Sequence, residues 1–71
     1  MGTNIKDIKK ELNMAAANLQ LENSEKGCCK ITMGGSETQK SGITRSKCNA
    51  IAAKFPGASC SFSPGVSCSE L

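Results

Sequence analysis

The chain has 71 residues, among them five cysteines, and carries nine basic against six acidic side chains, with no histidine, tryptophan or tyrosine. A chain this short forms one domain, here residues 1–71. It buries only about 60% of the surface that its unfolded form exposes. Such domains commonly need disulfides, a metal or a partner subunit for stability. Without histidine the chain cannot build a Cys–His pair, a histidine general base or a histidine-containing zinc site. We therefore expect no catalytic residues and a protein that is not an enzyme.

Positive charge gathers in the middle of the chain. Residues 1–27 balance four basic against four acidic side chains, whereas residues 28–57 carry five basic side chains against Glu37 alone. This excess makes an anionic surface a candidate partner. Nucleic acid is not expected, because its binding proteins combine denser positive charge with stacking aromatics. The basic residues proposed as a contact surface are Lys30, Arg45, Lys47 and Lys54.

The first predicted element is a helix over residues 4–22. Apolar residues recur there at steps of three and four, which places them on one face. Asn4 is the expected N-cap and Gly27 a candidate stop after the helix. The apolar stripe has two interpretations: it packs on the protein's own small sheet, or it associates with a second copy as a short coiled coil. If the stripe associates with a second copy, its residues are the interaction candidates: Ile5, Ile8, Leu12 and Leu19.

A β-hairpin is predicted next, over residues 28–41. The segment CCKITM alternates, so that Cys29, Ile31 and Met33 share one face and the three residues between and before them share the other. Gly34–Gly35 then marks a turn. The polar segment that follows predicts a weak return strand around residues 38–41, with a disordered loop as the alternative.

The second helix is predicted over residues 45–55. Thr44 suits the N-cap, and Ile43 and Cys48 then have the spacing of a hydrophobic staple. Pro56 and Gly57 follow and end it.

A last strand or hairpin is predicted over residues 58–69. Alternation there turns Ala58, Cys60 and Phe62 to one side and the serines between them to the other. SPGV indicates a turn, after which the chain pairs back or frays. Helix, hairpin, helix and strand make a small α+β fold, with helices packed on a weak antiparallel sheet.

Disulfide bonding is the interpretation that explains most of the cysteines. Five in 71 residues is high for a cytosolic domain and favours an oxidising or extracellular compartment, although no secretory signal peptide is recognisable. Cys29 is expected to face inward and to pair with Cys48, closing a loop of about 20 residues. Cys60 and Cys68 flank the SPG turn and are the candidates for a bridge across it, although the sequence leaves open about fifteen ways to pair four of the five cysteines. Cys28 then points outward as the spare thiol, available to form an intermolecular disulfide.

Other uses of the cysteines are less well supported by their spacing. Structural zinc sites draw ligands from pairs two to four residues apart, and adjacent residues of a strand point to opposite faces, so we expect neither a metal site nor a cofactor. An all-cysteine metal site nevertheless remains an alternative. So does a reduced protein in which all five cysteines are small buried apolar residues.

The function predicted from these observations is binding. We expect a small non-enzymatic protein, stapled by disulfides, that associates with itself or binds another macromolecule. No segment has the roughly 18 apolar residues that a transmembrane helix requires. The first alternative is an exported antimicrobial or signalling peptide, or its precursor. Gly34–Gly35 follows a charged helical segment and so resembles the leaders of exported bacterial peptides, which are cut after two glycines. This sequence departs from such leaders at Thr32, where they have an apolar residue.

Overall fold

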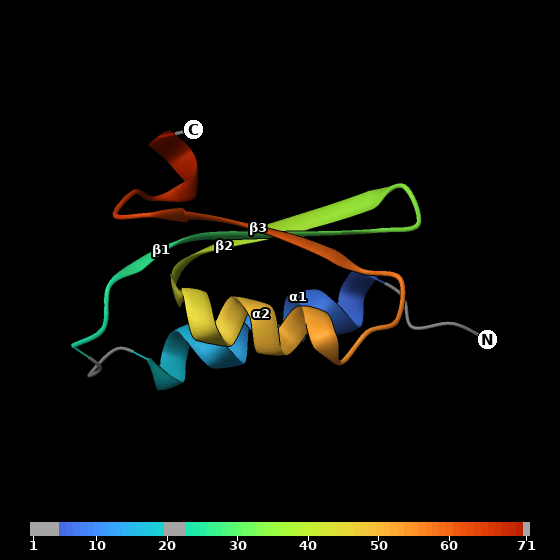
Figure 1. Cartoon of the computed structure of the whole chain (residues 1–71), viewed down its shortest axis with the longest axis horizontal. Helices are drawn as coiled ribbons and strands as arrows, with labels where there is room; N and C mark the ends of the chain where they lie inside the picture. Colours follow the sequence, from blue (N-terminus) through green and yellow to red (C-terminus); the bar gives the residue numbers. More distant parts are fainter. Residues whose placement is uncertain (1–4, 20–22, 71) are drawn as a thin grey trace.

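Two helices lie against one face of a three-stranded antiparallel sheet, in a computed structural model that describes residues 5–19 and 23–70. Figure 1 shows the sheet edge-on, with both helices below it and the C-terminal helical turn on the opposite side. The predicted α+β fold is confirmed. Its elements are α1 (Ile5–Asn18), β1 (Lys26–Met33), β2 (Ser36–Thr44), α2 (Arg45–Ala53), β3 (Ser59–Pro64) and the 3-10 turn η1 (Cys68–Glu70).

The sheet has the order β2-β1-β3, so β1 is central and the other two strands are edges. Lys30 of β1 lies opposite Gln39 of β2 and Ser61 of β3. Cys29 lies opposite Phe62, and Ile31 opposite Cys60, so the predicted inward sides of β1 and β3 form one continuous face. The register of β1 with β2 shifts between Gly27 and Cys29, which marks a bulge near the two cysteines.

The core fills the space between that face and the helices. Its buried members come from both helices, from β1 and β2, and from Leu19 and Phe55 just after the helices, because each element turns its apolar side inward. α1 packs mainly on β2, and α2 on β3 and β1. The buried residues of the core cluster are Ile8, Leu12, Ala15, Leu19, Cys29, Ile31, Ile43, Cys48, Ile51 and Phe55.

The start of α2 has the cap that the sequence predicts. The Thr44 hydroxyl accepts a hydrogen bond from the Lys47 backbone N–H at 3.2 Å, and Thr44 has extended backbone angles. Ile43 and Cys48, the predicted staple pair, are both fully buried. The helix ends at Ala53, two residues before the predicted end, and α1 is likewise shorter than predicted. Asn4, its expected cap, and residues 20–22 lie outside the described residues.

The hairpin is longer and more regular than expected. β2 extends over nine residues, whereas a short return strand or a disordered loop was predicted. Gly34 and Gly35 form the turn with φ angles of 59° and 84°. Positive φ at both central residues is typical of the type I′ turn, whose twist matches that of the flanking strands. These glycines therefore serve the hairpin.

Of the two C-terminal predictions, a strand or a hairpin, the strand is confirmed: β3 joins the sheet, and the residues after it do not pair back as a second strand. Gly65, with φ of 76°, turns the chain after β3, and its N–H donates to the Lys26 carbonyl at 3.0 Å. The chain then crosses to the outer face of the sheet, the side without α1 and α2, and ends in η1 (Figure 1). Val66 and Cys68 alternate there with polar residues, but the segment does not pair back, and Cys68–Glu70 form a short 3-10 turn.

Candidate functional site

A buried disulfide joins Cys29 of β1 to Cys48 of α2. Their Cα atoms are 5.7 Å apart, and both residues are fully buried. Strand alternation turns Cys29 toward the helices, and the staple at the start of α2 brings Cys48 to meet it. The bridge lies inside the core cluster and fastens α2 to the central strand, as the sequence predicts.

The second disulfide corrects the other two cysteine predictions. Cys28 was expected to be the spare thiol and Cys60 to pair with Cys68, but Cys28 is bonded to Cys68, across 40 residues of sequence. Cys28 does point to the outer face, yet it is only 1% exposed because the C-terminal segment folds over it. Alternation predicts the face on which a side chain lies but not what later covers that face.

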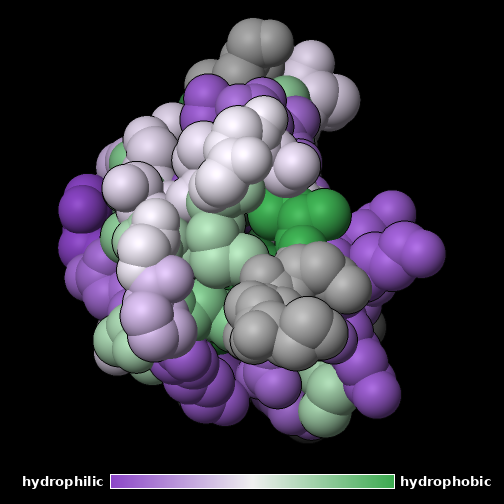
Figure 2. All heavy atoms as spheres, turned by 90° about the vertical axis from the view of Figure 1, so that its right-hand side faces the viewer, coloured by the Kyte–Doolittle hydropathy of each residue, from purple (hydrophilic) through white to green (hydrophobic). Residues whose placement is uncertain are grey.

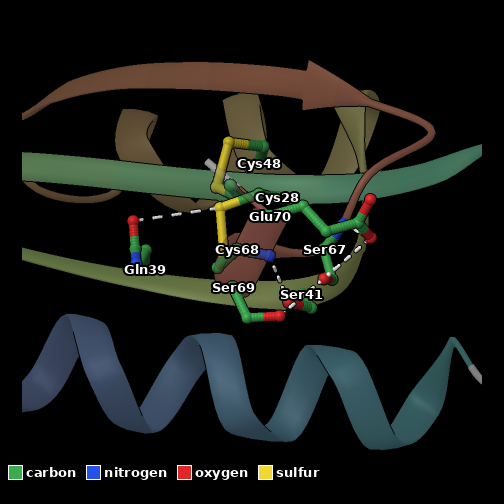
Figure 3. Close-up of a disulfide and its surroundings, with 9 residues drawn as sticks. Cys28, Gln39, Ser41, Cys48, Ser67, Cys68, Ser69 and Glu70 are labelled. Carbon is green, nitrogen blue, oxygen red and sulfur yellow. Dashed lines mark hydrogen bonds between the residues drawn. A yellow bond between two sulfur atoms is a disulfide. The ribbon is translucent and has the colours of Figure 1, made fainter.

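Polar contacts surround this outer bridge, as Figure 3 shows. The backbone N–H of Cys68 donates to the Ser41 hydroxyl of β2 at 2.8 Å. Ser67 donates to the Glu70 carboxylate from both its N–H and its hydroxyl, at 3.2 Å and 3.0 Å. The Ser67 and Ser69 hydroxyls are 2.9 Å apart. These contacts shape the turn around Cys68 and connect it to β2 at one point.

Cys60 is the free cysteine of the described residues, and it is exposed. It belongs to β3, on the side that faces the helices, but α2 does not cover it. Its thiol lies 3.2 Å from the side-chain oxygen of Asn49, an exposed residue of α2. The free thiol of Cys60 therefore lies at the surface, on an edge strand of the sheet and beside α2.

The two edges of the sheet differ in charge. β2 carries Glu37 and Lys40, and charged residues on an edge discourage pairing with another chain. β3, with sequence SCSFSP, carries no charge, and Pro64 at its end is the residue that interrupts strand pairing. The β3 edge from Ser59 to Ser63 thus lacks the usual protection.

The apolar stripe of α1 is part of the core. Ile8 and Leu12 are fully buried and Leu19 is 7% exposed, so these residues are not on the surface as interaction candidates would be. Ile5 is half-buried and packs at the margin of the core, as does Met33. Figure 2 looks at the end of the molecule that holds the β1–β2 turn and shows a band of apolar surface between polar regions.

The basic candidates do not form one patch. Lys30 projects from the outer face of the sheet, whereas Arg45 and Lys47 belong to α2 on the other side and Lys54 is the C-cap of that helix. The Lys54 ammonium pairs with Glu11 of α1 at 3.1 Å. The Arg45 guanidinium lies over the Phe62 ring, 5.0 Å from its centre.

A groove of about 400 Å³ opens beside the start of α2. Arg45, Lys47 and Phe62 line it, but so does Glu25 from the segment before β1. The groove therefore presents charges of both signs, and its chemistry does not select an anion.

No cluster of three or more potential metal ligands occurs within residues 5–19 and 23–70. In the same part of the chain no helix is long and apolar enough to cross a membrane. Comparison with protein-family models, with curated proteins and with solved structures found no match to this chain.

Proposed function

We propose that this protein is a non-enzymatic, disulfide-stabilised binding protein that associates with a second copy of itself through the β3 edge. The observation that carries the proposal is the exposed free thiol of Cys60 on an uncharged edge strand. An open edge offers a row of backbone donors and acceptors to a pairing strand. The odd cysteine then locks the pair with an intermolecular disulfide.

Strand geometry brings the two thiols together. Two β3 strands related by a two-fold axis at Cys60 are antiparallel, so Cys60 lies opposite its own copy. Directly opposed residues have Cβ atoms about 4.5–5.5 Å apart. A disulfide needs about 3.5–4.5 Å, so a small adjustment closes the bond. One Cys60 thiolate attacks oxidised glutathione and releases one glutathione thiol; the Cys60 thiolate of the second copy then attacks the mixed disulfide and releases the other. The two electrons and the two thiol protons thus pass to two molecules of glutathione. The same register places Ser59 opposite Ser61 of the second copy.

That register suggests a matched pair of variants. In S59K/S61K, each new lysine faces a lysine of the second copy; in S59K/S61E, each faces an opposite charge. Both serines are exposed, so the charges stay in water. Opposed charges change cross-strand pairing by about 0.2–1 kcal/mol each. We expect the S59K/S61E protein to form its disulfide-linked dimer about tenfold faster than S59K/S61K, measured by non-reducing intact mass with oxidised glutathione.

The control thiol lies on the opposite edge. In C60S/S36C the thiol is exposed on β2, and we expect its dimer to form more slowly than that of the natural chain because β2 carries charges. The proposal is overturned if S59K/S61E and S59K/S61K form disulfide-linked dimers at equal rates and the natural chain dimerises no faster than C60S/S36C. That result would show that the thiols meet by random collision. Unfolding midpoints confirm that each variant is folded.

An exported bioactive peptide is the second candidate, favoured by two disulfides in so short a chain. The bridges constrain how such a peptide is processed. Both connect a cysteine before Gly35 to one after it, so cutting the chain there leaves two pieces joined covalently. We therefore expect any bioactive form to contain both pieces. Intact mass of material from the native source tests this, and a free fragment beginning at Ser36 would contradict it.

A further inference from the structure

We propose that the Cys28–Cys68 bridge is a reducible clasp, which holds the C-terminal segment, residues 65–70, on the outer face of the sheet. A thiol reductant opens this clasp while the Cys29–Cys48 bridge keeps the rest of the fold intact. The protein thus has two folded states, a clasped state and a released state, selected by the thiol–disulfide balance of its surroundings.

The two bridges differ in access. Cys29 and Cys48 are each 0% exposed and belong to the core cluster, so a reductant reaches neither sulfur without opening the core. Cys28 is also covered, but Cys68 is partly exposed at the surface. A thiolate has to approach a disulfide sulfur directly in order to cleave the bond. Cys68 Sγ is the position that offers this approach.

Few other contacts hold the C-terminal segment. η1 has no buried residue. The bonds among Ser67, Ser69 and Glu70 lie within the segment and stabilise the turn without attaching it. Among the described residues, the segment is attached to the sheet by hydrogen bonds from Gly65 N–H to the Lys26 carbonyl and from Cys68 N–H to the Ser41 hydroxyl. Once the bridge opens, these hydrogen bonds do not offset the conformational freedom that the segment gains.

The core does not depend on the clasp. Cys28 lies outside the core cluster although it is buried, since what covers it is the C-terminal segment on the outer face. Release therefore exposes Cys28 and uncovers the half-buried Ser41 beside it, but no residue of the core cluster. The released state remains folded and presents a new thiol on the sheet.

The reaction balances with a dithiol as reductant. One thiolate of the dithiol attacks Cys68 Sγ, the sulfur–sulfur bond breaks, and Cys28 leaves as a thiolate and takes up a proton. The second thiol of the dithiol then attacks the mixed disulfide, which frees Cys68 as a thiol and oxidises the dithiol to a cyclic disulfide. Two electrons and two protons pass to the protein.

Stepwise reduction tests the clasp. The C60S variant is used, so that the result does not depend on self-association through β3. After timed exposure to dithiothreitol and trapping with iodoacetamide, peptide mapping identifies the modified cysteines. We expect a species modified at Cys28 and Cys68 alone to accumulate, and the Cys29–Cys48 bridge to open at least tenfold more slowly. Simultaneous opening of both bridges, or earlier opening of the inner one, overturns the proposal.

A permanently released variant gives the second measurement. We expect C28S/C68S/C60S to unfold cooperatively and to keep slow amide hydrogen exchange in α1, α2 and β1, with fast exchange in η1. The matched variant C29A/C48A/C60S retains the clasp and loses the inner bridge, and we expect faster exchange throughout. An unfolded C28S/C68S/C60S protein would show that the outer bridge is an obligatory staple and would refute the clasp.

Discussion

Gly27 lies where the backbone of β3 comes close to that of β1. It lies opposite Pro64 in the register, directly before the bulge that precedes the two bridged cysteines. A Cβ atom built on Gly27 would overlap the Ser63 carbonyl oxygen and come within 2.8 Å of Pro64 Cα. Both obstacles are backbone, so neither moves aside as a flexible side chain does. Because Gly27 has no side chain, the end of β3 at Pro64 lies directly against β1, and the C-terminal segment begins from there.

We therefore predict that Gly27→Ala destabilises the protein by about 3 kcal/mol or more, at the upper end of the cost of overpacking. The free energy of unfolding from denaturant titration gives the result, and Ser61→Ala on the exposed face of β3 is the control, expected to change it by less than about 0.5 kcal/mol. A Gly27→Ala protein as stable as the control would contradict the register of β1 with β3. The clasp also depends on this residue, because a displaced β3 moves Gly65 away from Lys26.

At the scale of elements, α1 shows how one sequence pattern fits two structures. Steps of three and four place apolar residues on one side of the helix, whether that side meets a sheet or a second helix. The structure resolves the choice in favour of the sheet, with Leu12 fully buried. Met14, two residues on, is 52% exposed and points to solvent. The two residues are similar in size and differ in the face they occupy.

This pair gives the second prediction. We expect Leu12→Ala to lower the free energy of unfolding of the monomer by about 2–5 kcal/mol, the usual cost of removing a buried leucine side chain. Met14→Ala should be nearly neutral, since its side chain is largely in water already. Denaturant unfolding of the C60S protein at two protein concentrations measures both. A Leu12→Ala effect that appears only as weaker self-association would instead support the coiled-coil interpretation.

Local signals account for most of what the sequence predicts correctly. The Thr44 cap, the staple of Ile43 with Cys48 and the inward side of β1 each depend on residues within a few positions of one another. The path of the chain after Pro64 does not. Its return to β1 brings together residues 40 apart in sequence, and the short alternation of residues 66–69 indicates a strand, not a segment that covers Cys28. The predicted pairing of Cys60 with Cys68 depended on their nearness in sequence. The turn at Gly65 does not bring these two residues into contact.

At the scale of the whole molecule, the two bridges tie together elements that a small core holds only weakly. One bridge closes 19 residues and fastens α2 to the central strand; the other closes 40 and fastens the C-terminal segment. In the loop-entropy model such loops are worth about 3 and 4 kcal/mol. Their sum is comparable to the total stability of many small domains, about 5 kcal/mol at the lower end. The core contains a single aromatic residue, Phe55, so it has little to offset their loss.

The third prediction follows from that comparison. We expect a variant lacking all cysteines, C28S/C29A/C48A/C60S/C68S, to be largely unfolded at 25 °C, with fast amide exchange along the whole chain, whereas C28S/C68S/C60S stays folded. Hydrogen exchange and far-ultraviolet circular dichroism of the two proteins measure the difference, which isolates the inner bridge. If the variant without cysteines unfolds cooperatively, packing alone is enough to stabilise the fold and the disulfides are not required for it. That result would agree with a protein that works with reduced thiols. The inner bridge would then no longer explain how the released state remains folded.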